Sequence, residues 1–334
     1  MVKQEYIQGF DDLRIQEYTN SFNTLQIYSH YKLSFPNRNT KLLVSGNFVI
    51  KILNEDKEIV FSKKFIIYED LVSVPMQIKR ARNIGEINDK HNLDFAIKSP
   101  NILFQSPLRN VKVLLLQNGQ ISTGIKNIQA MYTIGNDLIY KYDAETQFWA
   151  GNEYMYFENK DIRGANNNIA RVDSNAGLYS SYLYTNNARG KNQYTYWPDI
   201  NGNFILKNIN AENNEIETDY AWVYFSLSAP SYFGKGDIYI NGMFNNYALT
   251  PEFKMDYNKN KELYEKAIMV KQGFTNYQYV IADKTGKIDN ENAIDGNFFE
   301  TENNYFILVY YRENNQRYDR IIGKGSATSV DITN

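Results

Sequence analysis

Three pairs of acidic residues, each two positions apart, could supply the two carboxylates of a glycosidase. One carboxyl would protonate the leaving oxygen, and the other would act as a nucleophile or activate water. The pairs are Asp143 with Glu145, Asp289 with Glu291, and Glu300 with Glu302. Their spacing does not distinguish them from solvated turn carboxylates, which occur by chance in any chain of 334 residues. The sequence therefore predicts no catalytic residue and no enzyme.

The composition excludes most other kinds of catalytic and metal-binding site. The chain has no Cys and two His, His30 and His91. Thiolate nucleophiles, disulfides and Cys-based metal sites are thus excluded within these residues, and a Ser-His-Asp triad or a two-His metal site would have to use these histidines. Neither lies in a motif, and no phosphate loop, dinucleotide fingerprint or nucleophile elbow is present. The prediction is no cofactor and no metal.

The balance of charges limits the classes of binding partner that we expect. With 36 basic and 38 acidic residues, the net charge of -2 gives no field that would attract nucleic acid or an anionic membrane. No apolar run approaches the roughly 18 residues that a membrane helix needs, and residues 1–30 lack a signal-peptide pattern. We therefore expect no nucleic-acid partner and no direct membrane insertion.

Local clusters are the candidate binding residues. Arg312, Arg317 and Arg320 alternate with tyrosines and could dock an acidic partner, or could form a solvated sheet edge. A second cluster lies in the Asn-rich stretch 159–214, where long loops are expected: Tyr194, Tyr196 and Trp197. Loop aromatics suit recognition, and they also suit a loop packed on its own domain.

A third aromatic group lies in a predicted strand. Alternation would place Tyr220, Trp222 and Tyr224 on one face. Their rings could stack on sugars or anchor a protein, unless a neighbouring strand or domain covers them.

The elements that would position these residues are strands. Residues 47–53 and 61–67 alternate around a turn and predict a hairpin. Residues 111–116 are apolar on both faces, which predicts a strand covered on both sides, and Asn118-Gly119 then predicts a turn. Residues 261–270 contain helix formers but alternate, so we expect a strand. The fold class predicted is all-β, built from tandem immunoglobulin-like or early-set-like β-sandwich modules.

Composition shifts suggest four segments. A first module covers 1–70, a middle sandwich with long Asn-rich loops covers 71–218, and a C-terminal early-set-like sandwich covers 219–325. The small, polar residues 326–334 predict a flexible tail.

Ten short strings, in this order and spacing, resemble one family along nearly the whole chain. They are Tyr6–Phe10, Ser21–Thr24, Phe35–Asn37, Ser45–Phe48, Leu115–Gly119, Gly151–Glu153, Asp199–Gly202, Lys271–Gly273, Tyr277–Tyr279 and Arg317–Arg320. The family they resemble is the type IX secretion system plug proteins of Bacteroidetes. The resemblance implies a periplasmic, non-enzymatic protein that binds the outer-membrane β-barrel translocon and closes its periplasmic end while no substrate is present. Tyr194, Tyr196, Trp197, Arg312, Arg317 and Arg320 would then face the barrel.

Two further features qualify the resemblance. Gly236–Tyr247 looks like the first strand of glycogen-binding modules, with Tyr247 where those modules carry Trp, so we expect a likeness of fold and little sugar binding. A carbohydrate-binding accessory protein remains the alternative function.

Family members usually have further residues, including a Cys, before the position of Tyr6. We therefore expect the first sandwich to be incomplete, with an edge that needs covering.

Overall fold

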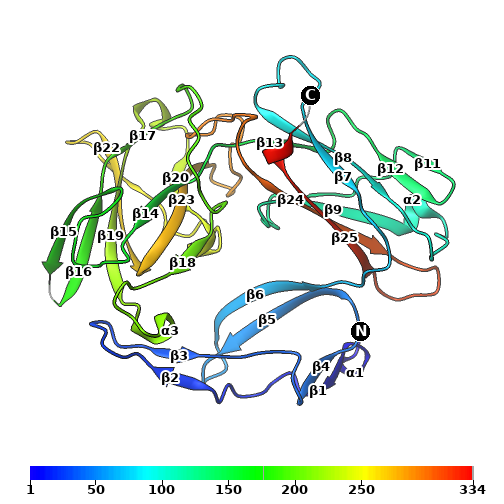
Figure 1. Cartoon of the computed structure of the whole chain (residues 1–334), viewed down its shortest axis with the longest axis horizontal. Coiled ribbons are helices and arrows are strands. Elements are labelled where there is room, and N and C mark those ends of the chain that lie inside the picture. Colours follow the sequence, from blue (N-terminus) through cyan, green and yellow to red (C-terminus); the bar gives the residue numbers. More distant parts are fainter. Residues whose placement is uncertain (176, 333–334) are drawn as a thin grey trace.

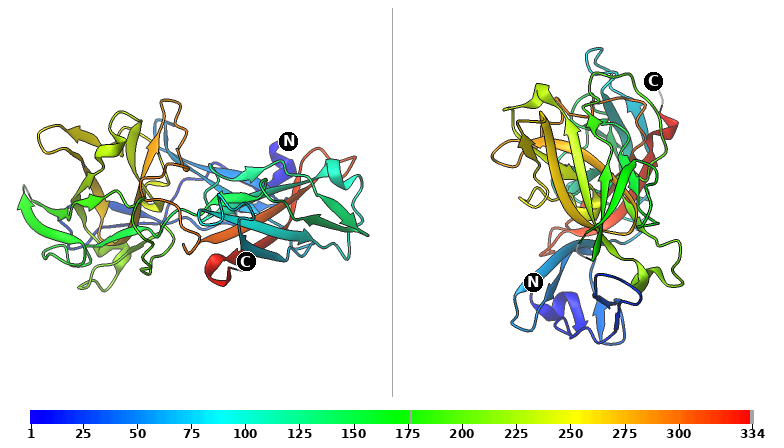
Figure 2. Two further views of the ribbon diagram at one scale, coloured as in Figure 1. Left: turned by 90° about the horizontal axis from the view of Figure 1, so that it is seen from above. Right: turned by 90° about the vertical axis from the view of Figure 1, so that its left-hand side faces the viewer.

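The computed structural model describes residues 1–175 and 177–332. It is 42% strand and 6% helix, which confirms the predicted all-β fold class with tandem sandwiches. Two lobes lie side by side, and the N-terminal strands run beneath both of them (Figure 1). The view from above in Figure 2 shows the lobes along the longest axis of the molecule.

The N-terminal module contains one short helix and three two-stranded antiparallel sheets, β1–β4, β2–β3 and β5–β6. Its elements are α1 (Lys3–Tyr6), β1 (Ile7–Gly9), β2 (Tyr18–Asn20), β3 (Ser29–Tyr31), β4 (Thr40–Leu42), β5 (Gly46–Leu53) and β6 (Ile59–Ile67). The predicted hairpin is confirmed as β5–β6, whose register pairs Phe48 with Phe65.

The split lobe is a sandwich made from two separate parts of the chain. One sheet has the order β11-β12-β8-β13 with β7 also on β8, and the other has the order β10-β9-β24-β25. The elements are β7 (Met76–Arg80), β8 (Lys90–Ile97), α2 (Pro107–Asn110), β9 (Val111–Gln117), β10 (Ile125–Lys126), β11 (Tyr132–Ile134), β12 (Asp137–Tyr140), β13 (Gln147–Trp149), β24 (Asn304–Tyr311), β25 (Arg320–Thr328) and η3 (Ser329–Asp331).

The inserted lobe lies between β13 and β24 in the chain. Its sheets have the orders β14-β23-β18, with β20 on β23, and β15-β16-β19-β22-β21, with β17 on β19. The elements are β14 (Met155–Glu158), β15 (Ile169–Asn175), β16 (Leu178–Leu183), β17 (Asn186–Asn187), β18 (Phe204–Leu206), α3 (Asn214–Glu217), β19 (Tyr220–Ser228), η1 (Pro230–Tyr232), β20 (Asp237–Asn241), η2 (Met243–Asn245), β21 (Asp256–Asn258), β22 (Leu263–Lys271) and β23 (Gly273–Ala282). β22 confirms the strand expected at 261–270.

Strand alternation explains how each lobe forms its core. On β9, Val111, Val113 and Leu115 face the interior of the split lobe. Leu116 faces the other way, against Ile66 of β6, so the prediction of a strand covered on both sides is confirmed. The N-terminal hairpin therefore covers the outer face of this sheet. Asn118 and Gly119 follow with positive φ values of 49° and 72°, as predicted for the turn.

The cores divide the chain differently from the predicted boundaries at 218 and 325. One core joins residues 72–148 with residues 305–322, and the other contains residues between 155 and 294. The difference arises because β24 pairs with β9, far away in the sequence, as well as with β25, which follows it in the chain. Residues 326–328 of the expected tail complete β25, and Ser329 is only 4% exposed. Residues 333 and 334 of that tail lie outside the described residues.

The N-terminal module is fixed to both lobes. On the inserted lobe, the carboxylate of Asp219 accepts from the main-chain N–H groups of Leu25 (2.6 Å) and Gln26 (3.0 Å). On the split lobe, Glu69 accepts from Arg320 Nε (3.0 Å), and its main-chain N–H donates to the carbonyl of Ile321 (2.8 Å). This module therefore joins the two lobes along one side of the molecule.

Candidate functional site

The chain passes between the lobes twice, in residues 150–154 and 295–303, which we call the two crossings. They are bonded to each other at several points. The Phe298 N–H and the Thr301 hydroxyl both donate to the Gly151 carbonyl (2.9 Å each), and Asn303 Nδ2 donates to the Ala150 carbonyl (2.8 Å). Two bonded segments resist bending more than one free linker does, so the crossings restrict how the lobes can move relative to each other.

His91 fixes the second crossing to the split lobe. Its ring is completely buried, with Nδ1 2.8 Å from the hydroxyl of Tyr305 and Nε2 2.7 Å from the carbonyl of Phe299. Burial lowers the pKa of His91 to about 4, so the ring is neutral at physiological pH. These contacts give His91 a structural role. His30 lies in the N-terminal module, 3.6 Å from the carboxylate of Glu215.

Glu153 is a buried acid at the centre of the junction. Its side chain is 1% exposed, and Oε1 accepts from the hydroxyl of Tyr194 (2.5 Å) and the N–H of Glu302 (3.0 Å). Arg189 donates to the main-chain carbonyl of Glu153 (2.9 Å) and to the carboxylate of Asp295 (2.9 Å). Burial raises the pKa of Glu153 to about 7. Sequence reasoning missed this residue, since an isolated Glu in the string Gly151–Glu153 gives no sign of burial.

The predicted aromatic loop cluster lies at this junction. Tyr194 is half-buried, and its hydroxyl donates to Glu153. Trp197 Nε1 donates to the main-chain carbonyl of Tyr154 (3.1 Å). Tyr196 is different, because 54% of its surface is exposed. Two of the three rings therefore help to hold the lobes together, and one is presented to solvent.

The predicted arginine cluster lies elsewhere, at the end of the β24–β25 hairpin beside the N-terminal module. Arg312 pairs with Asp319 (2.8 Å), and Arg320 pairs with Glu69. Arg317 reaches Glu5 (3.0 Å) with a side chain that is 81% exposed. Among the described residues, no hydrogen bond, ion pair or ring contact joins this cluster to Tyr194, Tyr196 or Trp197.

The third aromatic group does lie on the outer face of its sheet. Trp222 is 38% exposed, and Tyr220 and Tyr224 are half-buried. The ring of Tyr224 stacks on Tyr182, with centroids 4.4 Å apart, and the guanidinium of Arg171 lies 3.6 Å above Tyr182. The stacking on Tyr182 covers one face of the Tyr224 ring, whereas Trp222 makes no ring or cation contact among the described residues.

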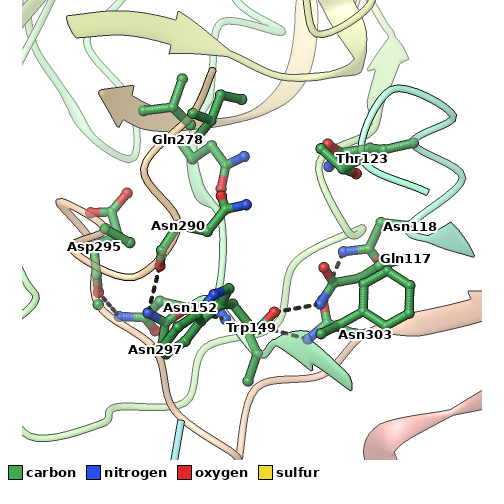
Figure 3. Close-up of a pocket in the computed structure, with 18 of the residues that line it drawn as sticks. Gln117, Asn118, Thr123, Trp149, Asn152, Gln278, Asn290, Asp295, Asn297 and Asn303 are labelled. Atoms are coloured by element: carbon green, nitrogen blue, oxygen red, sulfur yellow. Dashed lines mark hydrogen bonds between the residues drawn. The ribbon is translucent and has the colours of Figure 1, made fainter. Parts of the chain in front are cut away.

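A pocket of about 210 Å³ opens between the lobes beside the crossings; we call it the interlobe pocket. Its split-lobe side includes Gln117, Asn118 and Thr123, and its inserted-lobe side includes Gln278 and Asn290, as seen in Figure 3. Neither Lys nor Arg is among its described lining residues. Asn and Gln side chains supply much of the polar lining, and aromatic and aliphatic side chains supply the rest.

The described ranges hold no cluster of three or more His, Asp or Glu side chains placed to bind a metal ion. In residues 1–175 and 177–332, none of the helices has the length and apolarity to span a membrane.

Comparison with known proteins gives two matches. The family model for the type 9 secretion system plug protein 1st domain matches residues 1–69. A crystal structure of a hypothetical protein from Parabacteroides merdae ATCC 43184 has 30% sequence identity and a TM-score of 0.94, covering 98% of this chain and 83% of that chain. No curated protein matches the sequence.

Proposed function

Because the chain belongs to the type IX secretion system plug protein family, we propose that it is the non-enzymatic subunit that closes the outer-membrane translocon barrel. It binds the periplasmic end of the barrel while no substrate is present. The match of residues 1–69 to the plug family carries this proposal. Family membership implies a role in secretion at the periplasmic side of the outer membrane.

The way the lobes are held supports an occluding role. A body that blocks an opening must keep its shape when it is pushed, and its interface must still be modest enough to release. The bonded crossings and the N-terminal module connect the lobes at different places, through Gly151 on one side and through Asp219 and Glu69 on the other. A single hinge would therefore have to break two sets of contacts.

The six predicted contact residues are not equally suited to binding. Tyr196 and Arg317 offer the most free surface, with 54% of the residue and 81% of the side chain exposed. Tyr194, Trp197 and Arg320 already bond within the chain, so truncating them would act partly through the shape of the junction. Arg312 is exposed while pairing with Asp319. We therefore expect Tyr196 and Arg317 to contact the barrel directly.

Affinity capture of the translocon from solubilised outer membranes tests binding. The wild-type chain should retain the barrel, and the double variant Tyr196→Ala, Arg317→Ala should retain about tenfold less, as expected for the loss of one or two contacts of about 1.4 kcal/mol in total. The matched control is Tyr132→Ala, Arg163→Ala, which removes an exposed Tyr and an exposed Arg from other parts of the surface. Failure of the wild-type chain to retain any barrel would overturn the proposal.

Closure needs a separate measurement. In a planar bilayer containing the purified barrel, addition of the chain should lower the single-channel conductance, and the double variant should need a higher concentration for the same effect. An unchanged conductance despite demonstrated binding would rule out the occluding role.

A further inference from the structure

The walls of the interlobe pocket combine polar amides with apolar surface and carry little charge. Its carboxylates are Asp289 and Asp295, and neither is free: Asp295 pairs with Arg189 (2.9 Å), and Asp289 accepts from the side chain of Asn292 (3.0 Å). With these acids and no cationic lining group among the described residues, the pocket does not favour an anion. The chemistry favoured is neutral and rich in hydrogen bonds.

Several walls are held rigidly by their own bonds. Asn118 accepts from the N–H of Asn304 (2.9 Å) and donates to Asn303 (2.7 Å). Asn297 accepts from the N–H of Gly151 (3.0 Å) and donates to the carbonyl of Asn290 (2.8 Å). Both functional atoms of each amide are thus in use, and they fix the shape of the pocket without binding a ligand themselves.

Other side chains that line the pocket have hydrogen-bonding atoms without a partner in the described part of the chain. Within the part of the chain that the structure describes, the side-chain amide of Asn290 and the hydroxyl of Thr123 make no hydrogen bond, and Gln278 uses only its Nε2. Figure 3 places Gln278 and Asn290 on one side of the pocket and Thr123 on the other. Donors and acceptors from both lobes therefore face one space, where a single ligand could bridge them.

The volume sets the size of the ligand. The volume of 210 Å³ lies below the roughly 300–1,000 Å³ of sites for drug-sized ligands, which limits the ligand to about one small ring with its substituents. Phe148 and Trp149 add apolar surface to the wall. A molecule with many hydroxyl groups would fit this lining. Its hydroxyls could bond to the side-chain amides, its ring could lie against the apolar wall, and it needs no cationic partner. We propose that the interlobe pocket binds a neutral monosaccharide unit, held by Asn290, Gln278 and Thr123.

This site is distinct from the outer aromatic face. On that face the rings of Tyr182 and Tyr224 cover each other, whereas the interlobe pocket offers unused hydrogen-bonding groups. A sugar bound between the lobes would also contact both of them, so its binding should raise the melting temperature of the whole chain. Barrel binding and sugar binding are measured separately, and failure of one does not decide the other.

Saturation-transfer difference NMR on the full chain tests the proposal, with D-mannose, D-galactose and N-acetyl-D-glucosamine as separate probes. A ligand of about twelve heavy atoms at ordinary ligand efficiency should bind with a Kd of about 1 mM. The double variant Thr123→Val, Asn290→Ala should weaken binding about tenfold, because it removes two hydrogen-bonding groups. Both residues are exposed at the mouth of the pocket, so their loss should leave the fold intact.

Two controls locate the site. Asn260→Ala removes an exposed amide from the β21–β22 turn, and Trp222→Ala removes the most accessible indole of the outer face; neither should change the Kd. Any of three results overturns the proposal. These are no saturable signal with any neutral sugar, stronger binding of glucuronate or of the peptide analogue N-acetylglycinamide, and loss of binding in Trp222→Ala but not in the double variant.

Discussion

Replacing Glu153 with Gln should change how stability depends on pH. The wild-type pKa is raised from 4.5 to about 7 by burial. The folded protein therefore holds this proton more tightly than the unfolded chain does. The contribution of Glu153 is most favourable below the unfolded pKa, is lost as pH rises from about 4.5 to about 7, and stays constant above that range.

The magnitude follows from the two pKa values. A difference of about 2.5 corresponds to about 3 kcal/mol of unfolding free energy at pH 8. Glu153→Gln keeps an Oε1 that can accept from Tyr194 and Glu302, but its NH₂ group needs a partner in a buried site, at a cost of about 1 kcal/mol. We expect the variant to be about 2 kcal/mol more stable than wild type at pH 8 and about 1 kcal/mol less stable at pH 4.

The assay is urea unfolding monitored by tryptophan fluorescence at intervals from pH 4 to pH 8. Trp197, bonded beside Glu153 at Tyr154, reports on the junction. Glu300→Gln is the matched control, because this neighbouring acid is exposed and only its main-chain carbonyl meets Tyr194. If Glu153→Gln and wild type lose stability in parallel from pH 4.5 to 7, the assignment of the titration to Glu153 is wrong.

Two further predictions concern the fold. Gly273→Ala should lower the unfolding free energy by about 3 kcal/mol or more, because a Cβ would lie 1.9 Å from the carbonyl oxygen of Ile205. Gly85→Ala, which meets only a side-chain atom at 3.5 Å, is the control, and equal urea midpoints for the two variants would contradict the steric argument. Asp219→Ala should leave three main-chain N–H groups, two of them in the N-terminal module, without their charged partner and speed amide exchange in residues 18–31 about thirtyfold, for a local loss of about 2 kcal/mol. Residues 45–69 should keep their exchange rates, and faster exchange in both parts would show that the module detaches as one unit.

Local patterns in the sequence were sufficient to predict some of the strands, including β5, β9 and β22. The alternation at β5, the two apolar faces of β9 and the alternation through β22 all express side-chain periods that act within a few residues. These local patterns could not predict the division into modules, because that division depends on which strands pair with each other. Nothing near Tyr305 indicates that its partner is Gln117.

The candidate site could be predicted only in part, because it too depends on contacts between residues that are far apart in the sequence. Aromatic side chains could be recognised as a group, and Tyr194 and Trp197 do lie together at the junction. Burial of Glu153 and convergence of Thr123 with Asn290 depend on the contact between lobes, which residues of one segment do not encode. Whether the predicted cluster meets a barrel stays a prediction.

The long insertion in the split lobe determines the order in which the polypeptide can fold during synthesis. β9 ends at residue 117, and β24, its central partner, begins at residue 304. At ordinary elongation rates the ribosome needs about 10–40 s to make the intervening stretch. The inserted lobe can complete its own core in that time, while the apolar face of β9 waits without its neighbour. Until its last strands emerge, the nascent chain leaves the edge of β9 unpaired on the side that β24 occupies in the folded protein.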